Sequence, residues 1–262
     1  MDVPGRWAEL MRLPEARVPL DEAALLISAR ANPALDVYEQ LARLDELAGR
    51  VNAPDTSELC QLLFGRLGLR GNRDRYDDPD NSYLDQVLDR RLGIPISLSV
   101  VLIEVGRRCG VELQAVGMPG HFLVRDPAAP GQLIDAFDAG RRLDHGGCEQ
   151  LLQAVTAGAG RLTPEMLATT GTWAILTRML ANLDRSFERR GDHKALAWVT
   201  DMRVPIPDAP VGDRVHLATR LAGLGRLDTA SGVLERAAST LAESPARAKL
   251  VAQASDLRAR LN

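Results

Sequence analysis

The sequence has few of the residues on which several classes of protein depend. It contains three cysteines, Cys60, Cys109 and Cys148, which are widely spaced and form no Cys-x-x-Cys pair, so a disulfide framework or a zinc site is not expected. Lys194 and Lys249 are the only lysines among 32 basic residues, and the arginines are interspersed with 35 acidic residues. Without a basic patch, nucleic acid is not expected as a partner.

Long apolar runs are also missing. No stretch approaches the roughly 18 apolar residues of a spanning helix, and residues 1–20 carry charges where a signal peptide has a continuous apolar region. We therefore expect no membrane partner and a cytoplasmic location. The content of 45% hydrophobic and 26% charged residues, with a net charge of -3, is typical of a folded globular protein.

The first part of the chain predicts a lobe of short helices. Residues 21–70 contain three amphipathic segments, separated by helix-breaking prolines at Pro33 and Pro54. The third segment is expected to close at Gly68 and Gly71, because glycine ends helices readily.

A polar, turn-rich stretch follows over residues 72–82 and predicts a solvated turn in which Asn81 or Ser82 caps the next helix. Its acids lack the glycine and the late glutamate of a calcium loop. We therefore expect neither a metal ion nor a cofactor here; the acids in question are Asp74, Asp77, Asp78 and Asp80.

The most apolar segment covers residues 95–109 and predicts a helix that is buried on all sides. Its β-branched residues would by themselves favour a strand, but Pro95 suits a first helical position and Gly110 suits a helix end. Three stretches with strand character follow, at residues 111–116, 121–125 and 132–137. The pattern predicts an α+β fold in which a buried helix lies on an antiparallel sheet.

Two polar residues are predicted to meet on this sheet. If the second and third strands form a hairpin with Leu123 facing Leu133, then His121 and Asp135 project from the same side as cross-strand neighbours. A carboxylate beside an imidazole orients the ring and raises its basicity, as required behind a nucleophile. The nucleophile belongs at the N-terminus of the buried helix, where the dipole stabilises a thiolate, but Pro95 stands there. A purely structural hydrogen bond is the alternative role for the pair.

Two other residues are weak candidates for a nucleophile. Ser97 lies roughly 200° around the helix axis from Pro95, so its hydroxyl is expected to point away from the site. Cys109 is the cysteine closest in sequence to His121, but at the helix C-terminus the dipole opposes a thiolate. Cys60 and Cys148 are expected to be ordinary packing or surface residues.

The last third of the chain predicts helical repeats. Gly191 and Gly225 are 34 residues apart, as are Leu183 and Leu217. This period, together with the small residues after Gly225, matches a tetratricopeptide repeat. We therefore expect two domains, at residues 1–160 and 161–262. Helical repeats offer concave surfaces to peptides and helices, so an unidentified protein or peptide is the expected partner.

Three motifs of the chain form a recognisable set: Arg90-Arg91-Leu92-Gly93-Ile94-Pro95-Ile96-Ser97-Leu98-Ser99, Gly117-Met118-Pro119-Gly120-His121-Phe122-Leu123-Val124 and Ile134-Asp135-Ala136-Phe137-Asp138-Ala139-Gly140-Arg141. With these motifs the chain resembles the bacterial SirB-type transglutaminase-like proteins with C-terminal tetratricopeptide repeats. The resemblance implies a papain-related core in which a Gly-x-Cys at the helix start supplies a thiol and His and Asp on successive strands complete a triad. By this resemblance His121 and Asp135 match the second and third members, and Gly93-Ile94-Pro95 matches the first motif with proline in place of cysteine.

The proline implies a non-catalytic protein, or pseudoenzyme, that acts as a cytoplasmic protein-interaction module. The alternative is an acyl-transfer or peptide-hydrolysing enzyme that uses His121 and Asp135 with a non-standard nucleophile, either Ser97, Cys109 or an activated water.

Overall fold

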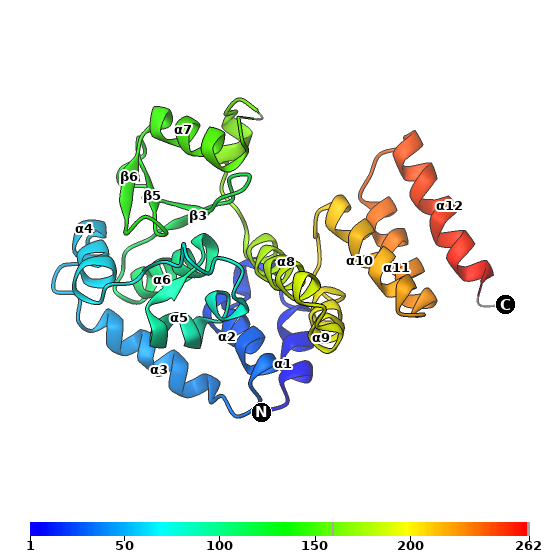
Figure 1. The fold of residues 1–262 in the computed structure, drawn as a ribbon, viewed down its shortest axis with the longest axis horizontal. Coiled ribbons are helices and arrows are strands. Elements are labelled where there is room, and N and C mark those ends of the chain that lie inside the picture. The colour runs from blue at the N-terminus through cyan, green and yellow to red at the C-terminus, as the bar shows by residue number, and fades with distance from the viewer. Residues whose placement is uncertain (159, 261–262) are drawn as a thin grey trace. The chain divides into compact units, whose positions relative to one another are not determined.

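The computed structural model describes residues 1–158 and 160–260, which form many helices and two small sheets (Figure 1). The chain divides into two compact units, Met1–Arg190 and Gly191–Asn262. The predicted domain boundary was at residue 160, whereas the first compact unit also contains helix α8 (Thr172–Arg190). Within the described part of the chain, no helix is both long enough and apolar enough to cross a bilayer.

Helices build the N-terminal lobe, as predicted. The three amphipathic segments of residues 21–70 are α2 (Leu20–Ala31), α3 (Val37–Ala48) and α4 (Thr56–Cys60). An earlier helix, α1 (Val3–Leu10), packs on α2. The third segment is not regular, because the chain continues after α4 as a π-helix, Gln61–Arg66, before Gly68 takes a positive φ of 72°.

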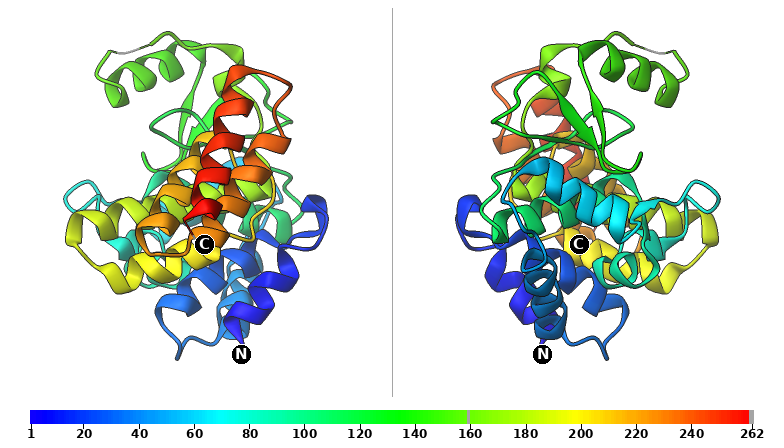
Figure 2. Two further views of the ribbon diagram at one scale, coloured as in Figure 1. Left: turned by 90° about the vertical axis from the view of Figure 1, so that its right-hand side faces the viewer. Right: turned by 90° about the vertical axis from the view of Figure 1, so that its left-hand side faces the viewer.

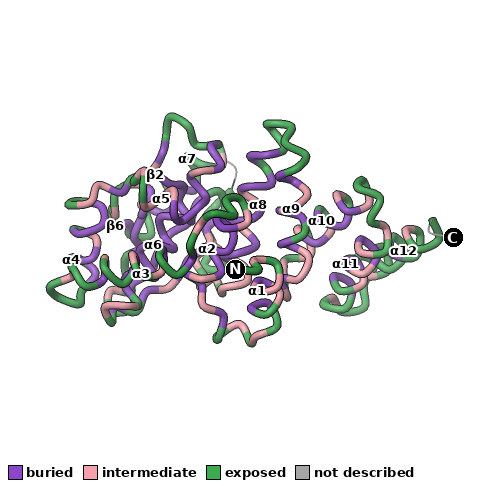
Figure 3. The backbone as a smooth tube through the Cα atoms, turned by 90° about the horizontal axis from the view of Figure 1, so that it is seen from below, coloured by how far each residue is buried: buried purple, intermediate pink, exposed green. Residues whose placement is uncertain are grey.

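The buried helix is α6 (Pro95–Arg108), and all of residues 95–106 are buried (Figure 3). Helices α2, α3, α5 (Leu84–Arg90) and α8 pack around it together with strands of the sheet. Because the helix is enclosed by neighbours, most of its side chains are apolar and give no amphipathic stripe. The buried polar exceptions are Ser97, Ser99 and Glu104.

The larger sheet has four antiparallel strands in the order β3-β4-β5-β6. It lies between α6 and α7 (His145–Val155) in Figures 1 and 2. The sequence predicted the first three strands, but not the fourth. The strands are β3 (Gln114–Val116), β4 (Leu123–Arg125), β5 (Leu133–Asp135) and β6 (Arg141–Leu143).

The predicted register of the central hairpin was wrong by two residues. Leu133 pairs with Arg125 rather than with Leu123, and Ile134 pairs with Val124. The connection between β4 and β5 is longer than the five or six residues assumed and contains its own turns at Ala129. A shift by two residues keeps every side chain on its face of the sheet, so the predicted neighbours His121 and Asp135 stay on one side.

A second, two-stranded parallel sheet joins β1 (Arg70–Gly71) to β2 (Leu92–Gly93), immediately before α6. The backbone N–H of Gly71 also donates to the carbonyl of Phe137 at 3.1 Å. The prediction that Gly71 ends a helix was therefore wrong. Glycine is required there because a Cβ atom would overlap the ring of Phe137.

The polar stretch between these strands is exposed over residues 73–77, as predicted for a solvated turn, but its end is buried. Asn81 is completely buried, its Nδ2 donates to the carbonyl of Arg75 at 2.7 Å, and its Oδ1 accepts from Asn72 Nδ2 at 2.9 Å. The predicted cap by Asn81 or Ser82 was wrong, because the N–H of Leu84 at the start of α5 donates to Oγ of Ser28 at 3.0 Å instead. The amide side chains thus replace a solvent shell with internal hydrogen bonds and fix the loop against the start of α6.

The second unit is a set of helices with its own core. Its helices are α9 (His193–Arg203), α10 (Val211–Gly223), α11 (Leu227–Ser239) and α12 (Pro245–Ala259). Leu217, Leu221, Ala230 and Ala237 are buried in a common apolar cluster of α10, α11 and α12. The small residues Ala230 and Ala237 of α11 are completely buried in this cluster.

Candidate functional site

The structure brings His121 and Asp135 into contact. Nε2 of His121 lies 2.9 Å from Oδ1 of Asp135, and both side chains are almost fully buried, with 6% and 2% exposure. His121 follows a tight turn in which Gly120 has a φ of 71° and the backbone N–H of His121 donates to the carbonyl of Met118 at 3.1 Å. The glycine permits a conformation that an L side chain would strain, so the turn delivers the imidazole to the carboxylate.

Asp135 does more than orient the ring. The same Oδ1 accepts hydrogen bonds from the backbone N–H groups of Phe137, at 3.0 Å, and Asp138, at 3.3 Å. The carboxylate therefore closes the turn after β5 as well as holding His121. Because Asp135 binds both the imidazole and the backbone, its bonds fit a structural role of the pair as well as a chemical role.

The second ring nitrogen of His121 is open. Among residues 1–158 and 160–260, Nδ1 has no hydrogen-bond partner, whereas Nε2 is held by Asp135. The ring of Phe137 packs edge-on against the imidazole, with 6.0 Å between the ring centroids. Arg178 of α8 fixes the backbone on the other side, since its guanidinium donates to the carbonyl of His121 at 2.8 Å. The imidazole is thus oriented on all sides and could accept a proton or hydrogen bond through Nδ1.

A chain of contacts links this pair to the start of α6. Phe137, which touches His121, lies against Gly71, and Gly71 pairs with Gly93 across the small parallel sheet. Pro95 follows two residues later, as the first residue of α6. These contacts connect the pair to the N-terminal end of the buried helix, where a thiol would meet a favourable dipole, but the residue present is a proline.

Ser97 does not offer a free hydroxyl to this site. Its side chain is fully buried, Oγ donates to the carbonyl of Asn81 at 2.6 Å, and it accepts from the backbone N–H of Ile94 at 3.1 Å. The hydroxyl joins the first turn of α6 to the Asn81 loop. Its bonds are those of a helix cap.

Replacing Ser97 with alanine is expected to lower the free energy of unfolding by about 1–3 kcal/mol, because a buried carbonyl and a buried N–H lose a partner. Ser99→Ala is the matched control in the same helix: the Oγ of Ser99 is buried without a partner, so its removal should cost little. Urea denaturation of both variants measures the difference. Equal losses would contradict the capping role.

None of the three cysteines stands at the start of α6, which is Pro95. Cys109 follows the last residue of α6, at the far end of a 14-residue helix that is about 20 Å long, and its Sγ donates to the carbonyl of Gly106 at 3.3 Å. Burial raises the pKa of Cys60 to about 11. Burial, followed by the charges of Asp144 and Asp135, also raises the pKa of Cys148.

Cys60 is accordingly expected to be alkylated by iodoacetamide at pH 8 about tenfold or more slowly than a free thiol, since little of it is thiolate at that pH. The measurement is a time course of alkylation read by peptide mass spectrometry, with glutathione as the reference thiol. A rate equal to that of glutathione would show that the thiol is neither buried nor raised in pKa.

Sequence reasoning missed several residues that shape the site. Phe137 and Tyr76 stack edge-on, with 5.8 Å between centroids, and Arg73 lies over the ring of Phe137. Asn81, whose Nδ2 donates to the carbonyl of Arg75, is predicted from the sequence only as a possible helix cap. Only its place in a polar stretch immediately before the predicted helix hinted at a role, because burial of an amide side chain is a tertiary property.

Comparisons with known proteins place this geometry in context. A family model described as the transglutaminase-like superfamily matches residues 34–181, which include His121, Asp135 and all of α6. A UPF0162 protein of Xylella fastidiosa is 39% identical over 193 residues, covering 68% of this chain and 68% of that protein. A UPF0162 protein of Pseudomonas aeruginosa is 35% identical over 215 residues, covering 79% of this chain and 77% of its own length.

A further relative has a different organisation. The human protein named F-box only protein 21 is 36% identical over 150 residues, which cover 53% of this chain but only 23% of that protein. No solved structure matches the chain significantly. The shared segment is therefore found both in bacterial proteins of similar length and within a much longer human chain.

Proposed function

Because this chain belongs to the transglutaminase-like superfamily, yet has Pro95 where its motif matches the cysteine of that superfamily, we propose that it is a non-catalytic member that acts as a protein-interaction module. The start of α6 carries this proposal: Pro95 has no nucleophilic atom, and the nearby Ser97 hydroxyl is bound to the backbone of Asn81 and Ile94. The location we propose is the cytoplasm.

The His121–Asp135 pair then serves the fold. Asp135 accepts from the imidazole and from two backbone N–H groups, so it holds the end of β5, the turn before β6 and the loop before β4 together. These bonds stabilise the fold whether or not a thiol is present.

The interaction surface that we propose lies in the second unit, on helices of the tetratricopeptide type found in the SirB-type proteins that this chain resembles. A groove of about 280 Å³ runs between α10 and α12. Its lining combines apolar and polar side chains, among them Val215, Ala222, Leu257, Gln253 and Asp256. Such a groove suits a peptide or helix with an apolar face.

The distribution of the shared segment supports this proposal. It recurs as about a quarter of a much longer human protein, as expected of a module that is combined with different neighbours rather than of an enzyme complete in itself.

An acyl-transfer or peptide-hydrolysing enzyme is the second candidate, and one observation favours it. The imidazole of His121 is oriented through Nε2 and, in the described part of the chain, its Nδ1 has no partner. Because Ser97 is bound to backbone groups and Cys109 lies at the far end of α6, an activated water would be needed to complete the site.

Electrophilic probes separate the two functions. The intact protein and a His121→Ala variant are treated with a fluorophosphonate and with iodoacetamide between pH 6 and 9. The non-catalytic function is supported if labelling is absent or is the same in both proteins. Rapid labelling that disappears with His121 would instead establish the enzyme.

The interaction role is tested with the full chain and one substitution in the groove. Ala222→Arg places a long charged side chain in the groove, and Ala252→Arg is the matched control on the exposed side of α12. A protein that is retained by the unmodified chain and by Ala252→Arg, but lost with Ala222→Arg, would support the proposal. Identical retention by all three would contradict it.

A further inference from the structure

A second cleft lies within the first unit, away from the His121–Asp135 pair, and has a volume of about 540 Å³. This is within the range of about 300–1,000 Å³ that is usual for ligand sites. One wall comes from the segment before α2 and from the end of α6, and the opposite wall comes from the residues leading into β3. The lining includes Asp21, Glu104, Arg107, Leu113, Thr170 and Ile175.

The wall at β3 is the open edge of a sheet. Strand β3 is the first of four, so its outer side has no neighbouring strand. The chain covers part of this edge itself: the N–H of Thr170 donates to the carbonyl of Ala115 at 2.8 Å, and Val116 forms an isolated antiparallel bridge with Thr169. The C-terminal part of β3 is therefore already paired with one extended segment of the chain, at Thr169 and Thr170.

The covering segment stops short of Leu113. Leu113 is the residue immediately before β3. Within residues 1–158 and 160–260, neither its N–H nor its C=O has a backbone partner. Leu113 is also one of the residues that line the cleft.

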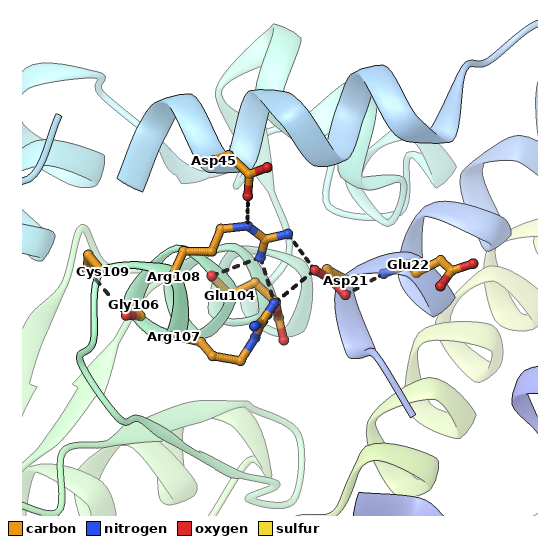
Figure 4. A network of polar contacts seen from close by, with 8 residues as sticks. All are labelled: Asp21, Glu22, Asp45, Glu104, Gly106, Arg107, Arg108 and Cys109. Carbon is orange, nitrogen blue, oxygen red and sulfur yellow. Dashed lines mark hydrogen bonds and ion pairs between the residues drawn. The ribbon is translucent and has the colours of Figure 1, made fainter. Parts of the chain in front are cut away.

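The opposite wall is held rigidly by charged side chains (Figure 4). Arg108 donates to Asp45 at 2.7 Å and to Glu104 Oε2 at 3.1 Å, and it also binds Asp21. Arg107 bridges Asp21 and Glu104 from the other side, at 3.1 and 2.9 Å. These bonds join α2, α3 and α6, so the wall cannot shift without breaking ion pairs.

One carboxylate oxygen of this network, Oε1 of Glu104, makes no hydrogen bond within the described residues. Every contact of the Glu104 carboxylate is made by Oε2, and Oε1 has no partner among the described residues, although the residue is only 3% exposed. Glu104 lines the cleft. Oε1 is therefore available to accept a hydrogen bond from a ligand or from water in the cleft.

We propose that this cleft binds an extended peptide of another protein, which adds to the free edge of β3. One residue of the peptide pairs with the N–H and C=O of Leu113, as in other strand additions. Oε1 of Glu104 accepts an N–H from the peptide, and an apolar side chain lies against Ile103 and Ile175, which line the same cleft. A peptide main chain is the occupant because it presents the donor and acceptor pair that Leu113 lacks. The site does not depend on the groove in the second unit.

The probe is a fluorescein-labelled peptide, Val-Thr-Val-Gln-Val-Thr-Val with an amidated C-terminus, whose alternation favours an extended chain. Binding to the full-length protein is followed by fluorescence anisotropy. Ala16, which lines the mouth of the cleft and is exposed, is replaced in Ala16→Trp to fill the cleft. The matched control is Ala34→Trp, at an exposed alanine outside it. A second peptide carries N-methyl groups on alternate residues of the face that would pair with β3.

We expect saturable binding to the unmodified protein and to Ala34→Trp, at least tenfold weaker binding to Ala16→Trp, and no binding of the N-methylated peptide. Absence of saturable binding, equal binding to Ala16→Trp, or equal binding of the N-methylated peptide would each overturn the proposal. Sedimentation of the unmodified chain tests the other occupant: a dimer that Ala16→Trp abolishes would assign the edge to a second copy of this protein and overturn it as well.

Discussion

Replacing Pro95 with cysteine is expected to create a thiol that reacts with iodoacetamide at pH 6. The new side chain would stand at the first position of α6, where the helix dipole stabilises a thiolate, and the contacts through Phe137, Gly71 and Gly93 connect this position with His121. Thiols in such surroundings have pKa values of about 3.5–7.5 instead of about 8.5. The alkylation rate at position 95 should therefore exceed that of Cys60 in the same chain by about a hundredfold, read by peptide mass spectrometry.

The dependence on the imidazole is the decisive comparison. The double variant Pro95→Cys, His121→Ala should react about tenfold more slowly at pH 6, because it loses the group that pairs with the thiolate. Pro95→Ala, which has no new thiol, accounts for labelling of the native cysteines. Equal rates in the single and double variants would show that the ring does not reach position 95, and would remove the basis for regarding this site as a triad without its thiol.

Replacing Asp135 with alanine is expected to lower the free energy of unfolding by about 3–5 kcal/mol. The change removes the acceptor for the His121 ring and for the backbone N–H groups of Phe137 and Asp138, in a place where water cannot replace it. Loss of one such bond costs about 1–3 kcal/mol, and three share this oxygen. Urea denaturation followed by circular dichroism measures the effect.

Asp135→Asn is the control for charge. Its side-chain oxygen can still accept from the two backbone N–H groups, so it should cost less than half as much as Asp135→Ala. If alanine costs under about 0.5 kcal/mol, as an exposed substitution does, the carboxylate is not a structural brace. The case for a chemical role of the pair would then become the stronger one.

The two proposed binding regions differ in how they recognise a partner. The groove of the second unit offers mostly side chains, so it would select the shape and apolar face of a helix or peptide. The cleft at β3 offers backbone groups, so it would select an extended conformation with little regard to sequence. A module with both could hold one partner at two places, which raises the overall affinity by linkage alone.

Much of the site could be predicted from the sequence because it depends on periodicity. Alternation along a strand placed His121 and Asp135 on one face even though the register was wrong by two residues, since an even shift preserves the face. The all-round apolar character of residues 95–106 predicted a buried helix for a similar reason.

What the sequence by itself determined is therefore local: the helices of the lobe, the buried helix, the facing pair and the absence of a thiol from the start of α6. The tertiary structure alone decided which polar groups are satisfied and which are left over. In the folded chain Asn81 is buried and binds a backbone carbonyl, and the Ser97 hydroxyl is hydrogen-bonded at the first turn of α6. Oε1 of Glu104 and the backbone groups of Leu113 have no partners among the described residues. The physical reason is that periodicity depends on neighbours along the chain, whereas hydrogen-bond satisfaction depends on segments many residues apart that meet only after folding.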